Sequence, residues 1–147
     1  MTMSAEERRV RWAVTGRTES PRDFRWAEQV ARVEDAVVGG DATAMLRTWQ
    51  AACLEALGSQ QWEPMIAVGD AALRVGRATG FTIAFEAKAR QAYHVALFRA
   101  HKQVSLEGIR RAAGGFDQVG DREVAEQALR LAQGLAERHG LGAPRLP

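Results

Sequence analysis

The chain of 147 residues has one cysteine, four prolines and one tyrosine, and it contains no long apolar run. The single cysteine, Cys53, excludes an intramolecular disulfide and fits a reducing compartment. No apolar segment approaches the roughly 18–20 residues that span a bilayer. The charged start MTMSAEERRVRW also lacks the apolar centre of a secretory signal. We therefore expect a cytoplasmic protein without a membrane partner.

Evidence for β-strands is also scarce. β-Branched and aromatic residues rarely alternate with polar ones, as they do in half-buried strands. Ala, Leu, Glu, Gln and Arg dominate instead, and these residues favour helices. A hydrophobic content of 46% with 26% charged residues argues against disorder. The composition predicts an all-α globular protein.

The charge is nearly balanced, with 20 basic and 18 acidic residues. This balance is too even for a dedicated nucleic-acid binder, so we expect no nucleic-acid partner. Six arginines between positions 8 and 25 form a local basic cluster, which we interpret as a solvated face rather than a phosphate-binding surface. Eighteen of the basic residues are arginine and two are lysine, a bias that fits a GC-rich coding sequence.

No motif for catalysis, metal binding or cofactor binding is apparent. The glycine-containing stretch RAAGGFDQVGD lacks the lysine and hydroxyl of a phosphate loop, and no strand precedes it. His94 and His101 lie two helical turns apart, about 10.5 Å, which is too far for chelation of one ion. Cys53 has no neighbouring histidine, and no carboxylate pair is set apart for acid–base chemistry. We expect a non-enzymatic protein without metal or cofactor.

Capping residues and glycines divide the chain into helices. A short helix is predicted after Ser4, ending near Gly16, and a longer one from Ser20-Pro21 to about Val38. The further expected helices begin at Asp41, near 60–64, at Phe81, at Ser105 and at Asp121, and they end near Leu57, Gly80, Lys102, Val119 and His139.

These helices follow a period of 40 residues. Three sets of positions coincide in this register: Gly40, Gly80 and Gly120; Ala52, Ala92 and Ala132; and Ala56, Ala96 and Ala136. The two alanine sets are one turn apart on one helix face, where small side chains allow close helix packing. A helix–turn–helix unit repeated at a fixed period is typical of a stacked α-hairpin array.

The segment YHVALFRAHKQVSLEGIRRAAGGFDQVGDREVAEQALRLAQGLAE carries a family resemblance. Ala96 lies near the end of its first helix, small residues recur through the second helix (Gly108, Ala112, Gly115), and a Gly-Asp junction opens the next hairpin. This pattern resembles the tetratricopeptide-repeat (TPR) family and TPR-like arrays. The usual family period is 34, and the family's tryptophan and proline positions are mostly missing here.

The resemblance implies a right-handed stack of antiparallel α-hairpins over residues 41–139. The expected repeats are 41–80, 81–120 and 121–139, preceded by N-terminal capping helices in 1–40 and followed by a flexible tail, 140–147. It also implies a concave groove lined by the first helix of each hairpin. The candidate groove residues are Gln50, Arg90, Tyr93, His94, Leu97, His101 and Arg130.

Two interpretations of the groove arginines remain open. Arg90 and Arg130 occupy equivalent positions and could clamp a carboxylate or acidic segment. Alternatively, they are exposed and form ordinary helix-face pairs, for example Arg90 with Glu86. The four tryptophans all precede position 63, and they either fill the core or mark a partner surface.

The leading functional hypothesis is a scaffold module that binds a peptide or partner helix of another protein. The alternative is a regulatory helical domain that senses a small molecule between its hairpins. We also predict a homodimer, formed through the tryptophan-rich N-terminal part or the last helix.

Overall fold

The computed structural model describes residues 21–141, and their side chains from residue 25 onward. Six α-helices account for most of this part: α2 (Pro21–Gly39), α3 (Ala42–Ser59), α4 (Trp62–Thr79), α5 (Thr82–Lys102), α6 (Leu106–Gln118) and α7 (Arg122–His139). No strand occurs between residues 21 and 141, which confirms the all-α prediction for this range. The predicted helix from Ser4 to Gly16, Trp12 and the tail after Leu141 lie outside the described residues.

The predicted helix boundaries coincide with specific backbone signals. The Asp41 side chain accepts a hydrogen bond from the Ala44 amide at 3.2 Å and caps α3. Left-handed glycines follow α2, α4 and α6 at 40-residue intervals, with φ angles of 73°, 82° and 83° at Gly40, Gly80 and Gly120. Side chains other than glycine rarely adopt this conformation, so the glycine register reflects three similar helix ends.

Two of these turns lack a side-chain cap for the helix that follows. Asp121 precedes α7 but makes no side-chain capping bond, which corrects the prediction that it caps the last helix. At the equivalent position before α5 the chain has Phe81, which is 60% exposed and has no capping side chain. The three turns therefore share a left-handed glycine but differ in the side-chain capping of the helix that follows.

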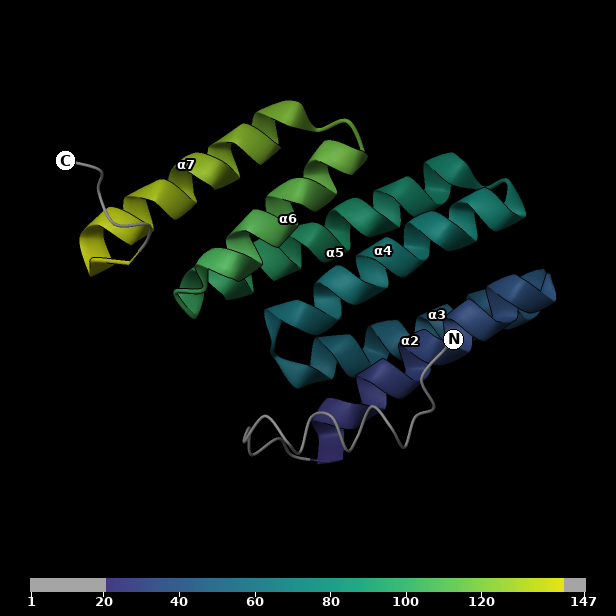
Figure 1. Ribbon diagram of the computed structural model, residues 1–147. Helices are drawn as coiled ribbons and strands as arrows, with labels where there is room; N and C mark the ends of the chain where they lie inside the picture. Colours follow the sequence, from purple (N-terminus) through teal and green to yellow (C-terminus); the bar gives the residue numbers. More distant parts are fainter. Residues whose placement is uncertain (1–20, 142–147) are drawn as a thin grey trace.

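The helices are arranged in two rows. Turns of two or three residues join consecutive helices, and each helix packs against the next along the chain. Contacts between alternate helices join α2 to α4 and α4 to α6, so these three form one row with α3 and α5 behind it (Figure 1). Helix α2 therefore packs against both α3 and α4. None of the helices in the described range is long and apolar enough to cross a bilayer.

The core lies between the two rows. Its aromatic centre is Trp49 of α3, which packs edge-to-face on Phe85 of α5 with ring centroids 5.8 Å apart. The Trp49 Nε1 donates a hydrogen bond to the Val68 carbonyl of α4 at 2.9 Å. Buried alanines at the register positions, such as Ala52, Ala92 and Ala132, let the helices approach closely. A second apolar cluster joins α6 and α7 to the end of α5.

Candidate functional site

Tyr93, a predicted groove residue, lies in the core, with no exposed surface. Its ring is held between Gly69 of α4 and Gly115 of α6. A Cβ built on Gly69 would lie 2.6 Å from the nearest Tyr93 ring carbon, and one built on Gly115 would lie 2.7 Å from it. The Tyr93 hydroxyl donates a hydrogen bond to Asp70 Oδ1 at 2.6 Å. Tyr93 therefore joins three helices and offers no surface to a partner.

Burial raises the pKa of the Tyr93 phenol above its ordinary value of 10.0, and the hydrogen bond to Asp70 and the Asp70 charge add to the rise. The folded chain therefore holds this proton at pH values where the unfolded chain releases it. We expect the free energy of unfolding to fall as pH rises above about 10, by up to about 1.4 kcal/mol per pH unit from this group.

This expectation has a direct measurement, because Tyr93 is the only tyrosine of the chain. Tyrosinate absorbance during an alkaline titration should rise only together with unfolding. Urea unfolding at several alkaline pH values should show a shallower decline for Tyr93→Phe than for the wild type. Titration at the ordinary pKa in a chain that stays folded would contradict the buried hydrogen bond.

Arg90, another predicted groove residue, contacts the turn between α6 and α7. Its Nε lies 2.9 Å from Asp121 Oδ2, and its Nη2 donates to the Val119 carbonyl at 3.0 Å. The ion pair is thus formed with Asp121, thirty-one residues away, rather than with Glu86. Arg90 fastens α5 to the start of α7, and its side chain is about one third exposed.

The other predicted groove residues lie on α3, α5 and α7, the first helices of the predicted hairpins. Leu97 packs partly buried against the core, whereas Gln50, His101 and Arg130 are exposed on three different helices. The exposed His94 packs edge-on against Phe116, with ring centroids 4.6 Å apart. No group of three potential metal ligands occurs within residues 21–141.

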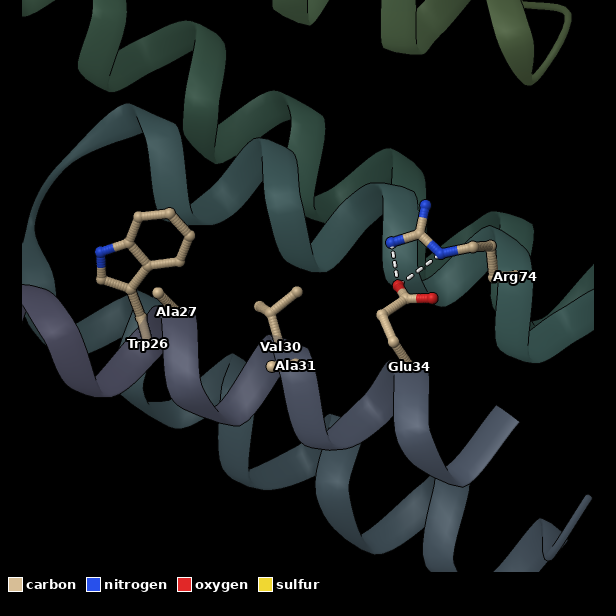
Figure 2. A pocket seen from close by; sticks show the side chains of 6 residues that line it. All are labelled: Trp26, Ala27, Val30, Ala31, Glu34 and Arg74. Carbon is tan, nitrogen blue, oxygen red and sulfur yellow. Dashed lines mark hydrogen bonds and ion pairs between the residues drawn. The ribbon is translucent and has the colours of Figure 1, made fainter. Parts of the chain in front are cut away.

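A groove of about 450 Å³ lies between α2 and α4. Its lining residues are Trp26, Ala27, Val30, Ala31 and Glu34 of α2 with Arg74 of α4. Trp26, Val30 and Glu34 follow one another at four-residue spacing, so they lie on successive turns along one face of α2 (Figure 2). Small alanines beside Val30 leave room above the helix backbone, and the floor of the groove is apolar.

An ion pair closes one end of this groove. Arg74 of α4 binds Glu34 of α2 through its guanidinium, and the side chains are 38% and 39% exposed (Figure 2). An ion pair in contact with water contributes about 0–1 kcal/mol, so Arg74 can exchange Glu34 for another carboxylate at little cost. At the other end stands the partly buried Trp26. The groove therefore combines an aromatic wall, an aliphatic floor and one exchangeable cation.

The sequence contains one signal for this groove, the Trp26–Val30–Glu34 stripe. The sequence-based interpretation placed residues 1–40 in a capping segment instead. The contribution of α4 was not foreseen, because Arg74 lies 40 residues beyond Glu34 in the chain. Comparison with protein-family models, with curated proteins and with solved structures gives no match for this chain.

Proposed function

We propose that this chain is a non-enzymatic interaction module, and that the groove between α2 and α4 binds a segment of a partner protein. In this proposal the helices form a TPR-like, right-handed stack of α-hairpins. The contacts of α2 with α4 and of α4 with α6 support it, as do the left-handed glycines at 40-residue intervals. The observation that carries the proposal is the open apolar groove with a cation at one end.

The chemistry of the groove defines the segment it would bind. From Trp26 to Glu34 the groove follows two turns of α2, about 12 Å, which is the length of two turns of a bound helix or of three to four extended residues. Val30 and the alanines beside it would contact aliphatic side chains of the bound segment. The Trp26 ring would pack against the same side chains. Arg74 would take an acidic residue that follows them. The proposed ligand is thus a short amphipathic segment with an acidic end.

A small-molecule sensor is the second candidate, because a volume of about 450 Å³ lies within the range of ligand pockets, roughly 300–1,000 Å³. The two candidates differ in what a purified chain would carry. A bound metabolite would appear as extra mass under native mass spectrometry, whereas a peptide-binding groove would retain no small molecule through purification.

Filling the groove tests the proposal. Ala31→Gln places a longer, uncharged side chain over the floor and changes the intrinsic helix preference by only a few tenths of a kcal/mol. We expect it to weaken capture of a host protein at least tenfold. Ala87→Gln makes the same change at an exposed position of α5 and should bind as the wild type does.

The measurement is a quantitative pull-down from host lysate, with the captured segment mapped by cross-linking from position 26. Equal capture by wild type and Ala31→Gln would show that the partner binds elsewhere. A bound small molecule that the wild type carries and Ala31→Gln loses would instead support the sensor function.

A further inference from the structure

A second groove, of about 500 Å³, lies between α6 and α7 at the C-terminal end of the helical body. In the preceding part of the chain, α4 packs against both α2 and α3, and α6 packs against both α4 and α5. By the same pattern, a further helix would pack against both α6 and α7, in the groove between them. No helix among the described residues follows α7 to occupy this position.

The floor of this groove is suited to close helix packing. Ala113 and Gly114 of α6 and Ala125 of α7 contribute small residues, and a Cβ built on Gly114 would meet nothing within 4 Å. Leu129 of α7 borders the floor with 50% of its surface exposed. A large aliphatic residue beside a row of small ones forms an apolar strip that a second helix can cover.

Four charged residues line this groove, Arg110 and Asp117 on α6 and Arg122 and Glu126 on α7, and the two on α6 are self-complementary. Arg110 and Asp117 lie seven residues apart on α6, two turns along the same face, and Ala113 and Gly114 lie midway between them. Both side chains are exposed, and neither forms an ion pair with any residue in the described range. A two-fold axis through the midpoint would bring each Arg110 opposite the Asp117 of an antiparallel copy, because a two-fold interface pairs residue i with j and j with i.

We propose that this groove binds a second copy of this chain, and that the two α6 helices cross antiparallel at Ala113 and Gly114. The dimer contains two equivalent Arg110–Asp117 pairs, one on each side of the axis. The small residues at the crossing allow the helices to approach closely, and Leu129 of each copy becomes covered. This surface is separate from the groove between α2 and α4, so the proposal does not depend on the peptide-binding function.

Charge exchange tests this geometry. In a dimer of Asp117→Arg, the new arginine at position 117 of each copy lies opposite Arg110 of the other copy. In a dimer of Arg110→Asp, the new aspartate at position 110 of each copy lies opposite Asp117 of the other copy. Each variant should weaken self-association about 10- to 100-fold, because opposed like charges penalise an interface strongly. A mixture of the two variants in equal amounts should restore association, since both cross-interface pairs are again of opposite charge. The double variant Arg110→Asp/Asp117→Arg should self-associate like the wild type.

Sedimentation equilibrium from low to high micromolar concentration gives the association constants. Circular dichroism and thermal unfolding check the fold, which both substitutions should preserve: aspartate near the start of α6 and arginine near its end both match the helix dipole. A monomeric wild type at every concentration would overturn the proposal and leave the groove to a helix of another protein. Single variants that associate like the wild type, or a mixture that stays monomeric, would also overturn it.

Discussion

Trp49→Ala is expected to lower the free energy of unfolding by about 4 kcal/mol, the effect of emptying a buried tryptophan site. Trp49 is 7% exposed and joins three helices. Its ring packs on Phe85 of α5, and its Nε1 donates to the Val68 carbonyl of α4. Since domains of this size are typically stable by about 5–15 kcal/mol, the variant should lose from about a quarter to most of its stability.

The matched control is Trp26→Ala in the groove between α2 and α4. This change removes the same atoms from a partly buried position, and we expect a loss of about 1 kcal/mol. Urea unfolding followed by circular dichroism measures both variants without relying on tryptophan fluorescence. Equal losses at the two positions would contradict the assignment of Trp49 to the core and Trp26 to an accessible groove.

Gly115→Ala is expected to lower the free energy of unfolding by about 2–3 kcal/mol, although alanine is the better helix former by about 1 kcal/mol. The added methyl group would lie 2.7 Å from the Tyr93 ring. The ring cannot move away, because Gly69 of α4 lies against it as well and its hydroxyl is bonded to Asp70. The loss corresponds to a decrease in melting temperature of roughly 4–12 °C for a chain of this size.

Gly134→Ala is the matched control for Gly115→Ala, and we expect it to stabilise the fold. This glycine lies within α7, and a Cβ built on it would meet nothing within 4 Å. Alanine there should raise the free energy of unfolding by about 0.5–1 kcal/mol. Thermal and urea unfolding of the two variants give the comparison. If Gly115→Ala were also stabilising, Tyr93 would not be clamped between the two glycines.

The sequence by itself determined the helices and most of their ends. Asp41, Ser105 and the glycines at 40-residue intervals act on the backbone within a few residues of themselves, so their effects can be read locally. The buried alanines at the register positions were predictable for the same reason, because helical periodicity places them on one face. The candidate groove residues were less predictable: the sequence placed Tyr93 in the groove and did not reveal that its side chain is buried in the core.

Only the tertiary structure decided which faces meet. Tyr93 is buried because Gly69 and Gly115, each more than twenty residues away, open a slot for its ring between α4 and α6. Arg90 binds Asp121 because α5 lies against the turn before α7. The α2–α4 groove exists because α4 stacks beside α2 and brings Arg74 to Glu34. Such contacts depend on the rotation and position of whole helices, which follow from the packing of all six together rather than from any local pattern.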